Sequence, residues 1–489
     1  MDPARLVMID LSGSSLTPDE RAFLRDRPPG GVCLFGRNVT DRFQVAEYLA
    51  ELRSLAGDDL IVAVDQEGGG VVRVTDLPYA PSAMALGAAD DVELTRAVAE
   101  ATGHGLRSVG IDVDFAPVAD VNSNPANPVI ADRSFGADPE LVSRHVAAFV
   151  TGLQEEDVGA TLKHFPGHGD TDVDSHLALP TVARPLAALR RVELPPFVAG
   201  IAAGAAAVMS AHIVVSGLDP SLPCTLSRAA LRGLLREELG FDGVIVTDAL
   251  DMRAISERWP APVAAVMSLA AGADLPLTLG PVEEHRAALD AIEAALDDGR
   301  LARDEVAASV GRLSRLTARF PGAPPDPDGA WRDGDEDVLA EAARRGLVVT
   351  GEPTRFAPGA TVVLAARPEV TASAASQVRV RPAEPLARAL EARGVSVRRL
   401  DPTALPADLG GALAGADALV YASTTRTLPP QEELEAASRL AGAARSAGLP
   451  FVHVGLWNPY VAERVPGPSV VAFGFRDVQA RAVAERLVG

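Results

Sequence analysis

The sequence of 489 residues is long enough for two or more domains, and its apolar and charged fractions, 47% and 23%, are ordinary for a soluble globular protein. A formal net charge of −21 disfavours nucleic acid or an anionic membrane as a partner, because both require a basic protein surface. The two cysteines, Cys33 and Cys224, lie in separate apolar segments and predict neither a disulfide framework nor a thiolate metal site.

Short apolar segments predict eight strands in the first part of the chain, at residues 7–11, 32–35, 60–64, 113–116, 160–162, 206–211, 244–247 and 273–277. Segments between them carry apolar residues at three-to-four spacing, as amphipathic helices do, at 41–55, 91–109, 139–155, 227–239 and 282–296. Eight strands alternating with helices predict an α/β fold, a (β/α)₈ or TIM-like barrel. A doubly wound open sheet is the alternative.

A barrel of this kind gathers its chemistry at the carboxyl ends of its strands. Polar residues do follow the third to the seventh predicted strands: Asp65 to Gly69, Asp120 to Arg133, Lys163-His164, His212 and Asp248. We therefore expect these side chains to meet at one mouth of the barrel.

A proline- and glycine-rich segment at 321–329 predicts a domain boundary. We expect the barrel at residues 1–320, a linker at 321–335 and a second domain at 336–489. Strands predicted at 361–365, 395–398, 418–422, 451–455 and 470–474 indicate a smaller, open parallel-sheet α/β sandwich. No Gly-x-Gly-x-x-Gly fingerprint follows its first strand, so a dinucleotide site is not expected there.

The stretch at 163–176, KHFPGHGDTDVDSH, contains three of the eight histidines and the only lysine, since the other 44 of the 45 basic residues are arginine. Chance could leave one lysine. The functional interpretation is that a compact ammonium is needed, which a planar guanidinium cannot imitate. Pro166, Gly167 and Gly169 predict an ordered loop after the strand.

Two carboxylates suggest a reaction. Asp248 ends the apolar strand in GFDGVIVTDALDM (240–252), where it could attack an electrophilic carbon, bind a metal or cap a helix. Asp174 lies two residues before His176 and could orient its imidazole, although a solvated loop pair is the alternative. Together they fit double-displacement glycoside hydrolysis, in which Asp248 attacks the anomeric carbon while His176 protonates the departing oxygen and then activates water.

The sequence resembles glycoside hydrolase family 3, in the two-domain form of its β-N-acetylglucosaminidase (β-N-acetylhexosaminidase) branch, which has an Asp-His dyad. The resemblance rests on 163–176, on DQEGG at 65–69 with Arg73, on NPVIADRSFG at 127–136 and on 240–252, and it covers the whole first domain. The second domain resembles the α/β sandwich of that family, most clearly at Trp457-Asn458-Pro459-Tyr460.

This resemblance implies that Asp248 is the nucleophile and that His176 is the acid/base, with Asp174 as its partner. It implies a sugar-binding set of Asp65, Arg73, Arg133, Lys163 and His164. Glu67 is expected behind that set, whereas His168 and Asp170 are expected to hold the shape of the loop. His212 could line the pocket or be a satisfied core histidine. Gly70 replaces an arginine found in many relatives, which leaves the aglycone open.

The resemblance implies a retaining exo-β-N-acetylglucosaminidase that forms a covalent glycosyl-aspartate. Its substrates would be terminal β-linked GlcNAc residues of muropeptides, in peptidoglycan recycling, or of chitin oligosaccharides. Phosphorolysis and the β-glucosidase activity of the wider family are alternatives, and so is assistance by the acetamido group. A metal-dependent hydrolase built on His164, His168, Asp170 and His176 would be of another class, but the His-Gly-Asp spacing matches no common zinc signature. A non-catalytic sugar-binding protein would require Asp248 or the dyad to lie away from the site. No metal and no cofactor are expected.

The first residues lack a basic segment followed by a long apolar core, so no secretion signal is expected. The least polar run, 198–218, contains Ser210 and His212 and divides into a helix end and a strand rather than a membrane span. We expect a cytoplasmic enzyme whose partner is an amino-sugar oligosaccharide, with no nucleic-acid or membrane partner. The sequence does not indicate the oligomeric state.

Overall fold

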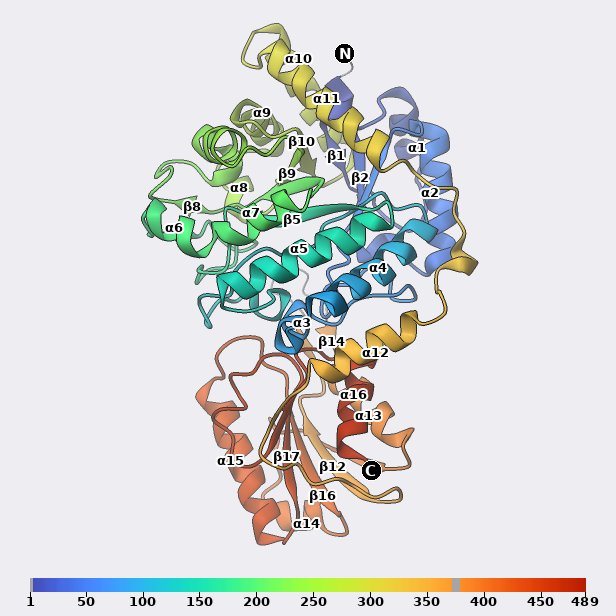
Figure 1. The fold of residues 1–489 in the computed structure, drawn as a ribbon, viewed down its shortest axis with the longest axis vertical. Coiled ribbons are helices and arrows are strands. Elements are labelled where there is room, and N and C mark those ends of the chain that lie inside the picture. Colours follow the sequence, from blue (N-terminus) through green and yellow to red (C-terminus); the bar gives the residue numbers. More distant parts are fainter. Residues whose placement is uncertain (1–2, 372–378) are drawn as a thin grey trace.

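The computed structural model describes residues 3–371 and 379–489. Its first part is a closed barrel of eight parallel strands, shown in the upper half of Figure 1. The strands, in their order around the barrel, are β1 (Met8–Ile9), β2 (Gly31–Leu34), β3 (Ile61–Val64), β4 (Val113–Asp114), β5 (Gly159–Phe165), β7 (Ala207–Ser210), β9 (Val244–Ala249) and β10 (Leu275–Thr278). Met8 pairs with Gly31 on one side and with Leu277 on the other, which closes the ring. The predicted (β/α)₈ barrel is confirmed, and the open-sheet alternative is wrong for this part of the chain.

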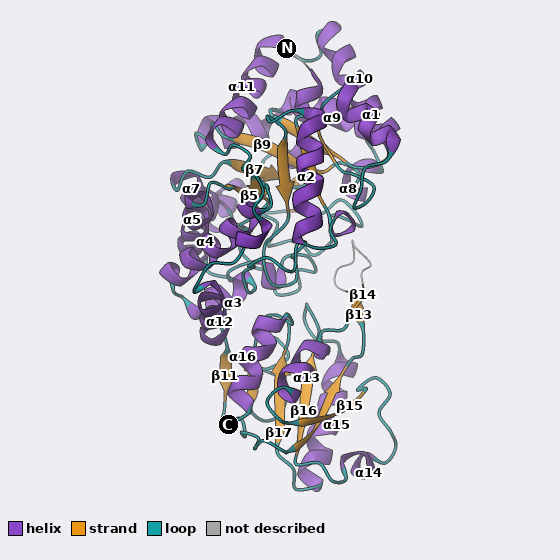
Figure 2. Ribbon diagram, turned by 90° about the vertical axis from the view of Figure 1, so that its right-hand side faces the viewer, coloured by secondary structure: helices purple, strands orange, loops and turns teal. Residues whose placement is uncertain are grey.

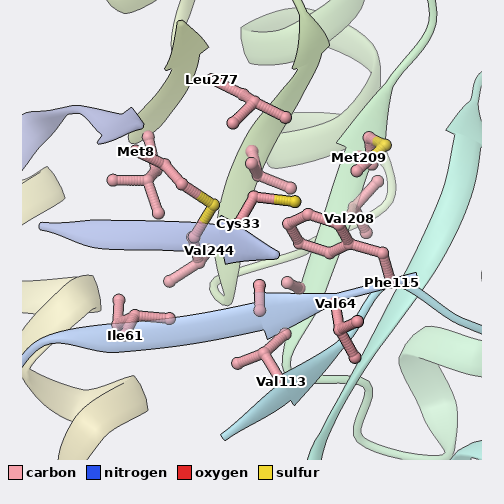
Figure 3. Close-up of a cluster of buried hydrophobic side chains, with 14 of the residues drawn as sticks. Met8, Cys33, Ile61, Val64, Val113, Phe115, Val208, Met209, Val244 and Leu277 are labelled. Atoms are coloured by element: carbon pink, nitrogen blue, oxygen red, sulfur yellow. The ribbon is translucent and has the colours of Figure 1, made fainter. Parts of the chain in front are cut away.

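Apolar side chains fill the barrel interior (Figure 3). None of the residues labelled there is more than 3% exposed: Met8, Cys33, Ile61, Val64, Val113, Phe115, Val208, Met209, Val244 and Leu277. Burying each such side chain stabilises the fold by roughly 1.5–3 kcal/mol. The interior is therefore a packed core, so an active site has to lie at the mouth of the barrel, where the polar residues are.

Helices surround the barrel on the outside (Figure 1). Aspartates cap three of them, because Asp41, Asp91 and Asp138 each accept hydrogen bonds from backbone N–H groups in the first turn. The predicted helix at 227–239 is a π-helix over most of its length, η5. The bounds are α1 (Pro18–Asp26), α2 (Arg42–Ala56), α3 (Ala83–Ala89), α4 (Val92–Ser108), α5 (Pro139–Glu155), α6 (Leu186–Val192), α7 (Leu194–Ala202), η5 (Ala229–Glu238), α8 (Arg253–Ser256), α9 (Ala261–Ala271), α10 (Val282–Asp297) and α11 (Arg303–Arg319).

Barrel strands β5 and β9 run two or more residues further than the sequence predicted. β5 continues to Phe165, which pairs with Ser210, and β9 continues to Ala249, which pairs with Leu277. Lys163, His164 and Asp248 therefore lie on strands and not in the loops after them. The prediction ended each strand where its apolar run ended, but backbone pairing does not require an apolar side chain. The sequence also gave no sign of the small β6 (Thr181–Val182) and β8 (Val214–Val215) pair.

The second sheet has the order β11-β18-β17-β16-β12-β15. Five of its strands are parallel, as predicted, whereas β11 is antiparallel at the edge. Helices α13 and α16 cover one face and α15 the other, so this part has three layers (Figure 1). The elements are α12 (Asp335–Arg345), β11 (Val348–Thr350), β12 (Thr361–Ala366), β13 (Val370–Thr371), β14 (Arg379–Val380), α13 (Ala383–Glu391), β15 (Ser396–Leu400), α14 (Leu409–Leu413), β16 (Ala418–Ser423), α15 (Gln431–Ser446), β17 (Phe451–Gly455), β18 (Ser469–Val471) and α16 (Asp477–Leu487).

The barrel and the second sheet meet through α12, which packs against α3, α4 and α16 (Figure 2). Arg345 at the end of α12 forms an ion pair of 2.7 Å with Asp91. Met84 and Ala85 of α3 share a small buried apolar cluster with Val471 of β18 and with Phe473, which follows that strand. The expected limits of the linker at 321–335 stay a prediction. Among residues 3–371 and 379–489, no helix combines the length and the hydropathy that crossing a membrane requires.

Candidate active site

A buried cluster of alternating charges lies at the carboxyl ends of β3 and β5. Lys163 Nζ is 2.7 Å from Asp65 Oδ1 and 2.6 Å from Glu67 Oε1, and the lysine side chain is only 2% exposed. Arg73 binds the other oxygen of Asp65 at 3.0 Å. Arg133 donates two hydrogen bonds to the oxygens of Glu67, each 2.8 Å long. Glu67, which we expected behind the sugar-binding residues, is thus a full member of their charge network.

This network keeps its carboxylates ionised. Burial acts to raise the pKa of Asp65, but Lys163 and Arg73 outweigh it and hold the pKa well below its usual range. Burial likewise opposes the charge on Glu67, yet Arg133 and Lys163 lower its pKa to about 2. The same carboxylates raise the pKa of Lys163 against the effect of its own burial. The cluster therefore presents charged hydrogen-bonding groups, which form stronger hydrogen bonds than neutral ones.

Asp120, on the segment after β4, orients the imidazole of His164. Its Oδ2 is 2.7 Å from His164 Nδ1, and its Oδ1 accepts hydrogen bonds from the backbone N–H groups of His164 and His168. Arg133 Nη2 lies 3.3 Å from His164 Nε2. Because a guanidinium can only donate, Nε2 accepts and Nδ1 carries the proton that is donated to Asp120. The sequence placed Asp120 near the mouth but gave no reason to assign it this role.

The loop after β5 carries the predicted dyad. His176 Nδ1 is 2.7 Å from Asp174 Oδ1, and the same oxygen accepts a hydrogen bond from the backbone N–H of His176. The carboxylate is buried, whereas the imidazole is 35% exposed. Burial alone would lower the pKa of His176, but Asp174 and Asp248 raise it above the ordinary value. The pair is therefore an oriented dyad and not a solvated loop pair.

The rest of this loop is fixed by contacts of its own. His168 is buried, with Nδ1 2.8 Å from Thr171 Oγ1 and Nε2 3.0 Å from Ser175 Oγ. Asp170 forms an ion pair of 2.6 Å with Arg184. These contacts hold the shape of the loop, which is the role that we expected for His168 and Asp170.

Asp248 lies at the end of β9, where its Oδ1 accepts a hydrogen bond of 2.8 Å from the backbone N–H of Ala249. Burial acts to raise the pKa of Asp248, but the imidazoles of His212, His164 and His176 bring it below the ordinary value. His212 is fully buried, with its nitrogens 2.8 Å from Thr225 Oγ1 and 2.9 Å from Ala249 O, so it is a satisfied histidine beside the carboxylate. Asp248 and His176 each shift the pKa of the other, so the predicted nucleophile and acid/base lie near enough to interact electrostatically.

The arrangement does not assemble the metal-ligand set considered above. Both nitrogens of His168 are taken by hydroxyl groups, His164 is held by Asp120 and Arg133, and Asp170 faces Arg184. Within the described parts of the chain, no group of three or more His, Cys, Asp and Glu side chains is placed to hold a metal ion.

The profile of the glycosyl hydrolase family 3 N-terminal domain matches residues 4–316, which is the barrel. The chain belongs to glycosyl hydrolase family 3. The β-hexosaminidase of Thioalkalivibrio sulfidiphilus is 39% identical over 320 residues, which cover 64% of this chain and 89% of that protein. The β-hexosaminidase of Pseudomonas aeruginosa PAO1 is 37% identical over 295 residues, which cover 59% and 86%.

One solved structure is similar to this chain over both of its domains. A glycoside hydrolase family 3 β-N-acetylglucosaminidase from Paenibacillus sp. strain FPU-7 has a TM-score of 0.91 and 35% identity, and the match covers 100% of this chain and 96% of that one. The predicted family and the two-part fold are therefore confirmed, and the protein is a glycoside hydrolase.

Proposed function

We propose that this family 3 enzyme is a retaining exo-β-N-acetylglucosaminidase with Asp248 as its nucleophile. The observation that carries the proposal is the meeting of three elements at one barrel mouth: Asp248 on β9, the Asp174–His176 dyad on the loop after β5, and the charge network around Lys163. The similarity to β-hexosaminidases and to a β-N-acetylglucosaminidase supports an N-acetylated amino sugar as the substrate.

Each residue has a chemical role in this proposal. Asp65, Arg73, Arg133, Lys163 and His164 bind the hydroxyls of the non-reducing sugar. The ionised Asp248 attacks the anomeric carbon and forms a glycosyl-aspartate, while His176 donates a proton from Nε2 to the departing oxygen. His176 then takes a proton from the water that cleaves this ester. Asp174 holds Nδ1 of His176, which orients the ring and stabilises its charged form.

The first experiment is a product assay on aryl β-GlcNAc and aryl β-glucoside, each with and without phosphate. Release of GlcNAc without a requirement for phosphate, and faster than release of glucose, supports the proposal. Phosphate-stimulated formation of GlcNAc-1-phosphate would instead indicate a phosphorylase, and faster cleavage of the glucoside would indicate a β-glucosidase. Muropeptide fragments and chitin oligosaccharides are then compared as natural substrates.

Variants test the two catalytic roles. Asp248→Ala should abolish turnover, whereas Asp242→Ala, which removes a 74% exposed carboxylate near the opposite end of the same strand, should not. His176→Ala should lower kcat/KM by roughly 10²- to 10⁴-fold for poor leaving groups and spare the first step for excellent ones. Equal loss for both kinds of leaving group would contradict the acid role.

Trapping Asp248 covalently with a fluorinated substrate analogue would support direct attack. Failure to label Asp248 would favour assistance by the acetamido group of the substrate. The cytoplasmic location and the role in peptidoglycan recycling stay predictions.

A further inference from the structure

Two loops of the second domain contact the barrel segment that follows β4. Arg426, just after β16, donates a hydrogen bond of 3.3 Å to the carbonyl oxygen of Val129 and lies 3.9 Å from the carboxylate of Asp132. Tyr460, after β17, accepts a hydrogen bond of 2.9 Å from the side chain of Asn122. The strand ends of the second sheet therefore face the active-site mouth, at the edge where open α/β sheets usually hold ligands.

Arg426 is held in place from within its own domain. The side-chain amide of Asn458 donates to the carbonyl oxygens of Thr425 and Thr427, at 2.7 and 2.9 Å, and so fixes the backbone on both sides of the arginine. The guanidinium carbon lies 5.4 Å from the ring centroid of Trp457, which is itself 2% exposed. The Trp457-Asn458 pair, noted in the sequence without a role, thus supports one arginine whose side chain is 16% exposed.

The barrel turn that Arg426 contacts leads directly into the sugar site. Ala131 in this turn has a left-handed backbone with φ of 43°, which an alanine adopts only when its surroundings enforce it. Two residues later, Arg133 donates to Glu67 and to His164. Burial raises the pKa of Asp132 to about 6, although Arg426 and Arg133 oppose the rise, so this carboxylate depends on a nearby cation.

The same turn is tied to the catalytic loop. The side-chain oxygen of Asn127 accepts the backbone N–H groups of Val129 and Ile130, each at 2.8 Å. Its amide nitrogen donates to His168 O at 2.8 Å and to Thr171 Oγ1 at 3.2 Å. A displacement of the turn would therefore affect both Arg133 and the loop that carries Asp174 and His176.

We propose that Arg426 is a positioning residue, through which the second domain fixes the 129–133 turn and so places Arg133 against the non-reducing sugar. The inference deepens the proposed function and rests on it, because Arg133 is assigned to sugar binding there. Because the Asp174–His176 dyad belongs to the barrel, the second domain does not have to supply a reacting group. Its role in this inference is to complete the sugar site.

The test compares Arg426→Gln with Arg388→Gln, an arginine of the same domain that is 60% exposed and pairs with Asp477. Inhibition by free GlcNAc is the decisive readout, because this monosaccharide has no leaving group. We expect Arg426→Gln to weaken its binding by roughly 10- to 100-fold and to raise KM equally for aryl and oligosaccharide substrates. Arg388→Gln should leave both constants within a factor of two of wild type.

Two further variants guard against a simple loss of folding. Arg426→Lys keeps the charge but lacks the planar guanidinium, so compared with Arg426→Gln it should restore part of the lost GlcNAc affinity. Asn458→Ala frees the loop that carries Arg426 and should weaken GlcNAc binding in the same direction, with a circular dichroism spectrum like that of the wild type. Failure of the lysine variant to bind better than the glutamine variant would overturn a positioning role for the charge.

Other outcomes separate the inference from the proposed function. Unchanged inhibition by GlcNAc in Arg426→Gln, with a loss confined to oligosaccharide substrates, would mean that Arg426 contacts the leaving group and would refute the inference. A wild-type enzyme that does not release or bind GlcNAc would instead refute the proposed function, before any variant is compared.

Discussion

The lysine at the centre of the charge network allows a quantitative test. Lys163 bridges the buried carboxylate of Glu67 and the carboxylate of Asp65, which is 17% exposed, at 2.6–2.7 Å. At an effective dielectric constant of 20, opposite charges at this separation attract by about 6 kcal/mol per pair. Most of this attraction is offset by the cost of removing the ions from water, and removing one partner of a buried pair costs about 3–5 kcal/mol. Since Asp65 and Glu67 each retain an arginine, we expect Lys163→Met to destabilise the barrel by about 3 kcal/mol, the lower end of this range.

The expected loss depends on pH in a defined direction. Lys163 and the arginines depress the pKa of Asp65 and of Glu67 in the folded protein. Stability from such groups is complete above the pKa of the unfolded chain, about 4, and is lost as the pH falls through the folded pKa. Without Lys163 the depression is smaller, so the variant has less of this stability to lose. The difference in the free energy of unfolding between wild type and Lys163→Met should therefore have its full size at pH 7 and should become smaller below about pH 4.

Urea unfolding at several pH values between 7 and about 2, the folded pKa of Glu67, measures both effects. Arg300→Met is the matched control, because Arg300 is 58% exposed and pairs with Asp298 at 2.8 Å at the surface. Its removal should change the free energy of unfolding by less than about 0.5 kcal/mol. Equal stabilities of Lys163→Met and wild type at pH 7, or a difference that does not narrow in acid, would refute the ionic account of this cluster.

Three other predictions concern the catalytic loop and its support. Asp174→Asn removes a charge that raises the pKa of His176, so the alkaline limb of the kcat/KM profile should move to lower pH. Burial raises the pKa of Glu193 to about 8, so the stability that this carboxyl contributes to the folded protein is lost as the pH rises from about 4.3 towards 8. Glu193→Gln should abolish this pH dependence of the urea unfolding midpoint. A Cβ on Gly169 would lie 1.7 Å from the carbonyl oxygen of Val121, so Gly169→Ala should displace the loop and lose activity. Gly442→Ala is the control, because the substitution there adds a Cβ that would meet no atom within 4 Å. This variant should stay active and gain up to about 1 kcal/mol of stability.

The barrel could be predicted because its strands are buried on both faces and therefore appear as continuous apolar runs, such as Ile61–Val64. The same rule failed where function interrupts it. Lys163 and His164 belong to β5, yet they look like the start of a loop because they are polar. Their side chains are satisfied by Asp65, Glu67 and Asp120, which lie on the segments after β3 and β4. Such partners are distant in the sequence, so the apolar pattern cannot reveal them.

The contact between the domains was beyond sequence reasoning for a related reason. Arg426 is one arginine among 44 and lies in no periodic pattern. Its meaning depends on Asp132 and Val129, which only the packing of the second sheet against the mouth brings near. Motifs led to the proposed reacting groups, but they did not indicate what holds those groups in place.

The environments of the imidazoles, more than the motif, support assigning proton transfer to His176. Burial lowers the pKa of His168 to about 4 and lowers that of His212, so both stay neutral near pH 7 and serve as hydrogen-bonding supports. Only His176, among these three, is partly exposed and has a pKa raised by neighbouring carboxylates. The adjacent Asp248 has its pKa lowered and so stays ionised. One ionised carboxylate and one imidazole made more basic, each influencing the pKa of the other, are the unequal pair that double displacement requires.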